Sequence, residues 1–166
     1  MRQIRKVAVF CGSNTGLGDQ YEAGAIALGT ALGRAGLGVV YGGTQMGLMK
    51  LLADAALAQG SNVHGVIVKR LHDKGQAHEG LSLLDVAADM RERKEWMADA
   101  ADAFIAMPGG IGTLEEAMEA WTLNQLGEID KPLGLYNVGG FYDGLMSFID
   151  QMVGQAFLPQ THRDWI

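Results

Sequence analysis

Cysteine, proline and long apolar runs are scarce in this sequence. Its 166 residues include one cysteine and three prolines. A single thiol cannot close an intramolecular disulfide, so nothing indicates an oxidising compartment, and we interpret Cys11 as a small buried residue at a strand end. No apolar run approaches the ~20 residues that cross a bilayer, and residues 1–6 lack a signal-peptide pattern. We therefore expect a cytoplasmic protein with no membrane partner.

Positive charge is also in short supply. Thirteen Lys and Arg residues stand against nineteen Asp and Glu residues, for a formal net charge of −6. This balance disfavours nucleic acid as a partner, because such binding needs a broad basic field. The histidines have neither metal-ligand spacing nor nearby paired carboxylates, so we expect no metal site. They are His64, His72, His78 and His162.

Glycine, in contrast, is abundant, with 24 residues, and the chain length predicts one domain over residues 1–166. Short β-branched runs alternate with longer helical patterns. Strands are predicted at Val7–Cys11, Leu37–Tyr41, Val63–Val68, Leu81–Ala87, Ala103–Met107 and Leu133–Asn137. Helices are predicted at Tyr21–Arg34, Met46–Gln59, Met90–Ala100, Thr113–Leu126 and Phe141–Val153. Residues 69–80 lack periodicity, and we interpret them as a mobile loop.

Apolar strands that alternate with helices are typical of a parallel sheet covered on both faces. We therefore predict an α/β fold with a doubly wound, mainly parallel, Rossmann-like sheet and helices on both faces. Ligands bind such sheets at the carboxyl ends of the strands, near the point where strand order reverses. Glycine-bearing turns follow three of the predicted strands, at Gly12–Gly16, Gly42–Gly43 and Gly109–Gly112. We expect the site at this edge.

The segment Met107–Glu116 runs from a buried strand through a glycine-rich turn into a helix. Such a turn points backbone N–H groups at one spot, to which the helix dipole adds positive charge, so a phosphate suits it. Neither the dinucleotide fingerprint nor the Walker pattern fits the spacing. An alternative is a plain capping box, with Thr113 as the N-cap and Glu116 three residues on. A cap alone does not require the preceding glycines.

A charged run at residues 90–97 raises a similar choice. Such a run is usually a solvated helix face. However, Arg93 lies three residues after Met90 and four before Met97, which places it on the apolar face of the helix. A buried arginine needs an anionic partner, and either Glu116 or a ligand phosphate could supply it.

Two motifs together carry a family resemblance. The segment Pro108–Glu116, read as P-G-G-x-G-T-x-x-E, and the preceding M-x-x-R-K at Met90–Lys94 resemble the signature pair of the Lonely Guy (LOG) family. These are cytokinin riboside 5′-monophosphate phosphoribohydrolases. The segments Val9–Ser13, Val40–Gly43 and Lys131–Asn137 resemble further parts of the family, so the likeness extends over essentially the whole chain.

The resemblance implies release of a free base and ribose 5-phosphate from a nucleoside 5′-monophosphate, without metal or organic cofactor. It implies that Arg93 and Glu116 are the catalytic pair. The residues expected to bind substrate or its phosphate are Gly12, Ser13, Gly43, Lys94, Gly109, Gly110, Ile111, Gly112, Thr113, Leu114, Glu115 and Thr122. Family members are homodimers or larger homo-oligomers whose site is completed across the subunit interface.

Four residues depart from the family pattern, which has histidine at Arg91, glycine at Thr44 and Lys50, and a substrate-contacting glutamate at Gly75. The catalytic pair is intact, so the expected reaction stands. Thr44 and Gly75 would lie near the ligand, so these two departures bear on the choice of substrate, which is AMP or an N6-prenylated AMP.

Other functions remain open. The chain could be a general purine nucleotide nucleosidase, a base-transferring relative, or a non-enzymatic carrier of molybdenum cofactor with the same fold. Some family members are described as lysine decarboxylases, but the sequence has no recognisable Schiff-base lysine site for pyridoxal phosphate. A purely structural role explains neither the glycine turns nor an inward Arg93.

Overall fold

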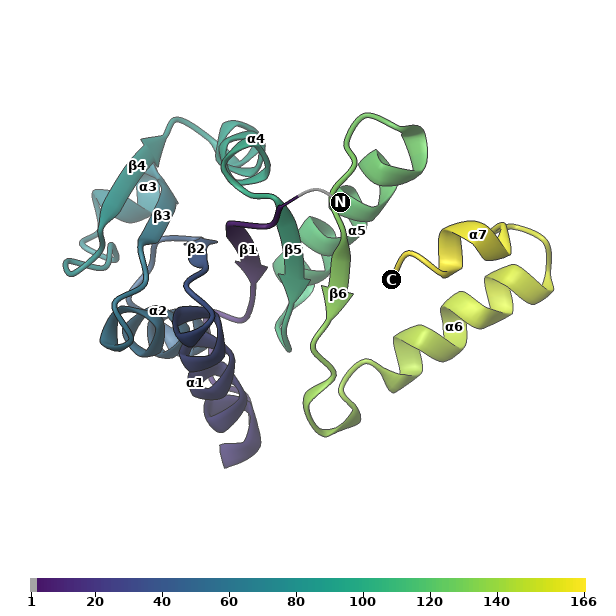
Figure 1. The fold of residues 1–166 in the computed structure, drawn as a ribbon, viewed down its shortest axis with the longest axis horizontal. Coiled ribbons are helices and arrows are strands. Elements are labelled where there is room, and N and C mark those ends of the chain that lie inside the picture. The colour runs from purple at the N-terminus through teal and green to yellow at the C-terminus, as the bar shows by residue number, and fades with distance from the viewer. Residues whose placement is uncertain (1–2) are drawn as a thin grey trace.

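A computed structural model describes residues 3–166 and contains one six-stranded sheet in the order β4-β3-β2-β1-β5-β6 (Figure 1). All neighbouring strands pair in parallel. The strands are β1 (Lys6–Phe10), β2 (Gly38–Tyr41), β3 (Val63–Val68), β4 (Leu83–Ala87), β5 (Ala103–Ala106) and β6 (Leu133–Leu135). The helices are α1 (Asp19–Arg34), α2 (Gly47–Ala58), α3 (Lys69–His72), α4 (Met90–Ala100), α5 (Ile111–Leu126), α6 (Asp143–Gly154) and α7 (Gln160–Arg163), with a 3₁₀ turn, η1, at Val138–Gly140.

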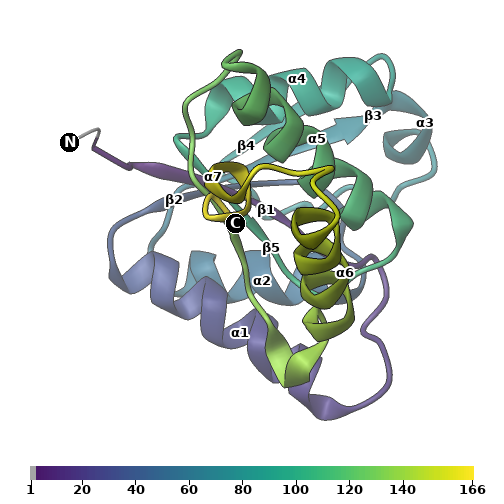
Figure 2. The same ribbon diagram turned by 90° about the vertical axis from the view of Figure 1, so that its right-hand side faces the viewer.

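The sheet is doubly wound, as the sequence predicts. The chain builds outward from β1 to β4 and then returns to place β5 on the other side of β1, so strand order reverses between β1 and β5. Figure 2 shows α1 and α2 on one face and α4 on the other. This reversal is where an open α/β sheet forms a crevice at its carboxyl edge.

Two apolar cores follow from the alternation of side chains along the central strands. In β1, Val7 and Val9 pack with α1 and α2, whereas Ala8 and Phe10 pack with α4, α5 and α6. Phe10 stacks on Phe104 of β5 at a ring-centroid distance of 5.7 Å. The strands are therefore buried on both faces, which explains their near-continuous apolar sequence.

Every predicted strand and helix is present, with ends that shift by two residues or fewer. The shift matters most at α5, which begins at Ile111 rather than Thr113. The short elements α3, η1 and α7 were not predicted, because four residues or fewer carry no readable periodicity.

The prediction of an irregular loop at residues 69–80 is wrong in part. Residues 69–72 form α3, and the following residues are tied to the turn after β2 through an antiparallel bridge between Thr44 and Ala77. The sequence gives no local sign of this because the partners lie far apart along the chain.

Across the described residues, no helix combines the length and apolar composition that crossing a bilayer requires. We expect no signal peptide at residues 1–6, and residues 1 and 2 of that segment lie outside the residues that the structure describes.

Candidate active site

Helix α5 starts directly from the glycine turn that follows β5. Its N-cap is Gly110, which has no side chain, and no side-chain group caps the first turn. The N–H groups of Ile111, Gly112 and Thr113 have no acceptor inside an α-helix, so they are available to an external anion. The capping-box alternative is therefore wrong, because Thr113 is the third helical residue rather than the N-cap.

The glycines of this turn serve two different purposes. At Gly109, an added Cβ would overlap the side chain of Thr113 and would lie 2.9 Å from the backbone nitrogen of Gly12, so packing requires glycine there. At Gly110 and Gly112 an added Cβ would meet no protein atom within 4 Å. The space over these two residues is open to a ligand.

The glycine turns after β1 and β5 meet at the point where strand order reverses. The amide of Gly12 donates a hydrogen bond to the carbonyl of Pro108 at 3.1 Å. A cavity of about 170 Å³ lies between the two turns, and Gly12, Ser13, Gly109 and Gly110 all line it. The structure thus brings together four residues that the sequence assigned to phosphate or substrate binding.

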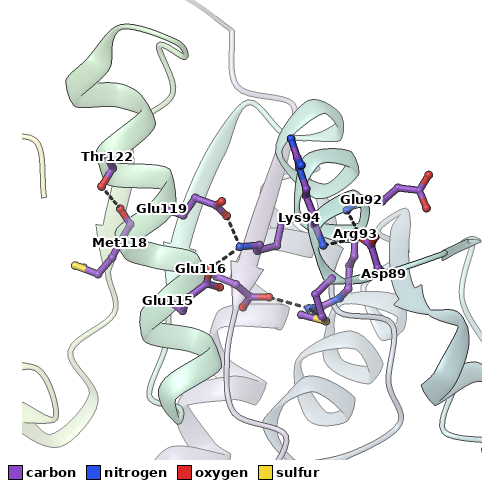
Figure 3. A network of polar contacts seen from close by, with 11 residues as sticks. Asp89, Glu92, Arg93, Lys94, Glu115, Glu116, Met118, Glu119 and Thr122 are labelled. Atoms are coloured by element: carbon purple, nitrogen blue, oxygen red, sulfur yellow. Dashed lines mark hydrogen bonds and ion pairs between the residues drawn. The ribbon is translucent and has the colours of Figure 1, made fainter.

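Arg93 and Glu116 form a buried ion pair beside these turns (Figure 3). Arg93 Nη1 donates to Glu116 Oε1 at 2.9 Å, and Arg93 Nε donates to the carbonyl of Val66 at 2.9 Å. The side chains are 8% and 6% exposed. The spacing argument that placed Arg93 on the inner face of its helix is confirmed, with Met97 buried four residues later.

The N-terminus of α4 is fixed by Asp89, whose side chain accepts hydrogen bonds from the amides of Arg91 and Glu92 at 2.9 Å. This cap starts the helix at Met90 and so sets the rotation that turns Arg93 toward the sheet.

The ionisation of Glu116 is shaped mainly by burial. Burial raises the pKa of the Glu116 carboxyl above its ordinary value, and the charge and hydrogen bond of Arg93 offset only part of that rise. A carboxylate whose pKa is raised accepts a proton more readily than an ordinary one, and the fixed cation beside it favours the ionised form that can do so.

Lys94 lies next to this pair but is held by two other acids. Its Nζ atom lies 2.5 Å from Glu115 and 2.9 Å from Glu119, both on α5. Partial burial works to lower the pKa of Lys94, but hydrogen bonds to Glu115 and Glu119 outweigh it, so the pKa lies above its ordinary value. A lysine with a raised pKa is a poor Schiff-base nucleophile.

The other predicted site residues fall into different places. Ile111 is 83% exposed at the start of α5, and with Leu114 it lines an apolar hollow beside the glycine turn. Thr122 lies on the side of α5 away from α4 and donates to the carbonyl of Met118 (Figure 3), so within one chain it does not approach Arg93.

Gly43, in the turn after β2, is buried against Ile67 of β3.

The departures from the family pattern are also spread out. Thr44 is buried and its hydroxyl donates to the sulfur of Met49. Lys50 is exposed and pairs with Asp54. Gly75 is exposed, with a φ of +70° that favours glycine. Arg91 lines a groove of about 340 Å³ between α4 and α5, into which Lys94 and Glu116 also face.

Sequence reasoning missed two histidine–carboxylate pairs. His64 Nε2 lies 2.8 Å from Asp85 Oδ2, and His78 Nε2 lies 2.9 Å from Asp54 Oδ1. The partners are 21 and 24 positions apart, so no local motif reveals them.

Within residues 3–166, no group of three or more His, Cys, Asp or Glu side chains is placed to hold a metal ion.

Fold and site together define a doubly wound α/β protein with a glycine turn and a buried arginine–glutamate pair at its carboxyl edge. A family model described as "Possible lysine decarboxylase" matches residues 49–166. Over 161 residues the chain is 45% identical to the cytokinin riboside 5′-monophosphate phosphoribohydrolase LOG1 of Arabidopsis thaliana, covering 97% of this chain and 76% of the relative. It is 44% identical over 164 residues to LOG3 of the same plant, covering 99% and 76%.

The chain belongs to the LOG family. Among solved structures, the molybdenum cofactor carrier protein of Chlamydomonas reinhardtii superposes with a TM-score of 0.71 at 19% identity, covering 90% of this chain and 85% of that one. An identity this low shows a shared fold alone.

Proposed function

We propose that this chain hydrolyses the N-glycosidic bond of a nucleoside 5′-monophosphate to release a free base and ribose 5-phosphate. The observation that carries the proposal is the buried Arg93–Glu116 pair, 2.9 Å apart, beside an uncapped helix N-terminus. The phosphoribohydrolase activity for which relatives at 44–45% identity are named supports the same reaction.

The phosphate binds at the start of α5 in this proposal, where the N–H groups of Gly112 and Thr113 and the helix dipole favour an anion. Glu116 follows Thr113 by three residues, close to one helical turn of about 5.4 Å. That distance is comparable with the span from the 5′-phosphate to the anomeric carbon of the ribose. A phosphate at the turn therefore brings the bond to be broken near the Glu116 carboxylate.

Cleavage of this bond passes through a state with positive charge on the anomeric carbon and ring oxygen. The Glu116 carboxylate stabilises that charge and accepts a proton from the attacking water, whose oxygen joins the anomeric carbon. The bond between that carbon and the base nitrogen breaks, and the base leaves with its electron pair and takes up a proton. Arg93 holds Glu116 in place and favours its charged form.

Finer aspects belong to the same proposal. The substrate is AMP or an N6-prenylated AMP, the compartment is the cytoplasm, and the working form is a homodimer or a larger homo-oligomer. The groove between α4 and α5 faces Glu116 and is lined by Phe10, Phe104 and Leu123 as well as by charged groups. A partner subunit at this groove would complete the site and could bring Thr122 of a second copy near a substrate.

Hydrolysis is favoured over a carrier role because carriage requires no buried catalytic pair. Decarboxylation is disfavoured because Lys94 is engaged by Glu115 and Glu119. Transfer of the ribosyl group to another base uses the same bond cleavage and has to be separated by experiment.

The test is incubation of the purified protein with AMP and with isopentenyladenosine monophosphate, followed by chromatography of free base and ribose 5-phosphate. Release of both products, abolished by Glu116→Gln, supports the hydrolase. A parallel reaction with an added acceptor base separates transfer from hydrolysis, because transfer yields a new nucleotide. Absence of release from either substrate, with tight binding of a pterin, would favour the carrier.

A further inference from the structure

We propose that His78 is a positioning residue for this reaction, which acts through Asp54 and the turn after β2 to hold the guanidinium of Arg93. The inference rests on the proposed function, since it assigns Arg93 to the catalytic pair. His78 is part of neither sequence motif, and the spacing of the histidines gave it no role.

The contacts of His78 indicate which ring nitrogen donates and which accepts. It is 9% exposed, and its Nδ1 accepts a hydrogen bond from the amide of Gly80 at 3.0 Å. An imidazole nitrogen that accepts carries no proton, so the neutral ring has its proton on Nε2. Nε2 therefore donates to Asp54 Oδ1 at 2.9 Å. Nδ1 thus binds the backbone of its own segment, at Gly80, and Nε2 binds a side chain of α2, Asp54.

Residues 75–80 run alongside the turn after β2 and bond to its backbone. The amide of His78 donates to the carbonyl of Gly43 at 3.0 Å, and the amide of Gln45 donates to the carbonyl of Gln76 at 3.0 Å. The side chain of Gln45 adds a bond to the carbonyl of Gly75 at 3.0 Å. The His78–Asp54 contact thus clamps a segment that is itself bonded to the turn on both sides of Thr44.

This turn forms part of the surface on which Arg93 lies. A Cβ added to Gly42 would overlap Nη2 of Arg93, so the guanidinium packs directly on the backbone there. Gly43 packs on β3: a Cβ added to this glycine would lie 3.3 Å from the backbone nitrogen of Ile67. Val66, the residue before Ile67, accepts the hydrogen bond from Arg93 Nε. Displacement of the turn would open space beside Nη2 and loosen the guanidinium against Glu116.

The second partner of Asp54, Lys50, offers a control for the His78–Asp54 contact. Asp54 also pairs with Lys50 one turn earlier on α2, and both contacts hold its pKa below the ordinary value against the opposing effect of burial. Lys50 is exposed and bonds to nothing in residues 75–80 that the structure describes. Removal of Lys50 therefore changes the charge beside Asp54 while leaving the clamp in place.

The experiment compares two replacements that each keep half of the histidine contacts. His78→Asn keeps a short acceptor for the Gly80 amide but cannot reach Asp54, whereas His78→Gln can reach Asp54 with its amide. We expect His78→Asn to lower kcat for AMP by about ten- to a hundredfold through misplacement of Arg93, with KM little changed because the phosphate turn is untouched. His78→Gln should recover most of the lost kcat.

A second readout does not depend on turnover. The carboxyl ¹³C resonance of Glu116, assigned by its loss in Glu116→Gln, reports the pKa of that group. Since Arg93 lowers the pKa of Glu116, a loosened guanidinium should raise it further in His78→Asn and not in His78→Gln. Asp54→Ala breaks the same contact from the helix side, and alanine suits a helical position, so it should reproduce both effects if His78→Asn folds poorly.

The controls are His72→Asn, an exposed histidine at the end of α3 just before this segment, and Lys50→Ala, the other partner of Asp54. Both should retain wild-type kcat and an unmoved Glu116 resonance. The positioning role is overturned if His78→Asn and Asp54→Ala melt at lower temperature but keep kcat and the Glu116 pKa, or if His78→Gln is no better than His78→Asn. A wild-type protein that releases no base rejects the proposed function instead, while the Glu116 titration still decides the role of His78.

Discussion

Arg93 Nη1 and Glu116 Oε1 meet at 2.9 Å although their helices follow strands on opposite sides of β1. Helix α4 follows β4 at one edge of the sheet, and α5 follows β5 beyond the reversal of strand order. The ion pair therefore joins the two halves of the fold near the carboxyl edge of the sheet, where the glycine turns also lie. The first predictions concern this pair.

Glu116→Gln should lower kcat by about 100-fold or more, because it removes both the negative charge and the proton acceptor near the anomeric carbon. Glutamine keeps an oxygen that can accept from Arg93, so the variant should remain folded. Steady-state kinetics with AMP, alongside circular dichroism, checks both statements. Full activity in a folded Gln variant would exclude the catalytic role of Glu116.

Arg93→Ala should destabilise the protein as well as inactivate it. The change leaves a buried carboxylate without its partner, which typically costs about 3–5 kcal/mol. It also removes the hydrogen bond to the carbonyl of Val66. Urea unfolding at pH 7 measures the loss, and Arg91→Ala, on the exposed face of the same helix, is the matched control. Equal free energies of unfolding for both variants would contradict a buried, structurally coupled pair.

The raised pKa of Glu116 predicts a specific pH dependence of stability. In the window that begins near the ordinary value of 4.5 and extends up to the raised pKa, the folded protein binds more protons than the unfolded chain. The contribution of Glu116 to the free energy of unfolding therefore falls as pH rises through this window. Glu116→Gln should lack that contribution. The difference in free energy of unfolding between the two proteins, measured by urea titration at several pH values, should accordingly decrease with pH; a rising difference would mean that the pKa is lowered instead.

Lys94 should act on Glu116 from a distance. Its charge lowers the pKa of Glu116, whereas Glu115 raises it. Lys94→Met should therefore move the acid limb of the kcat/KM–pH profile to higher pH, because Glu116 then gives up its proton later. Glu95→Gln, on the exposed side of α4, changes charge nearby and serves as the control. A profile that moves equally in both variants would point to general surface charge.

Two glycine substitutions in the turn should have opposite effects on stability. Gly109→Ala should destabilise the fold, because its methyl group would overlap Thr113. Gly112→Ala lies at a helical position with open space, so it should stabilise α5 by up to about 1 kcal/mol. If the phosphate binds here, the same methyl group blocks it and raises KM. Thermal unfolding and KM for AMP, measured on both variants, test the separation; an unchanged KM in Gly112→Ala would move the phosphate elsewhere.

The sequence was sufficient to predict those features that depend on local patterns. Apolar runs and glycine turns gave every strand, and the spacing of Met90, Arg93 and Met97 placed the arginine inward. The start of α5 was mispredicted because Thr113 and Glu116 fit a capping box, while the actual N-cap, Gly110, contributes no side chain. A sequence pattern therefore favours the threonine as N-cap even where the helix begins earlier, at a glycine that caps it with no side chain.

Features that depend on distant partners were not predicted. Residues 75–80 are ordered by hydrogen bonds to a turn some thirty positions earlier, and His78 finds Asp54 across 24 positions. The ion pairs of Lys94 with Glu115 and Glu119 were not predicted either, because they form only when α4 packs beside the face of α5 from which both acids project. Each of these contacts exists only once the sheet brings separate segments together.

The turn at the start of α5 presents main-chain N–H groups rather than cationic side chains. A ligand held there is recognised by the path of the backbone, which most point mutations leave unaltered. If the proposed nucleotide substrate binds here, affinity for its phosphate is insulated from most substitutions, and discrimination between one nucleotide and another must arise from the side chains around the turn. Arg91, which differs from the family pattern and lines the groove beside Glu116, is thus a position at which a new substrate preference can evolve without loss of the anchor.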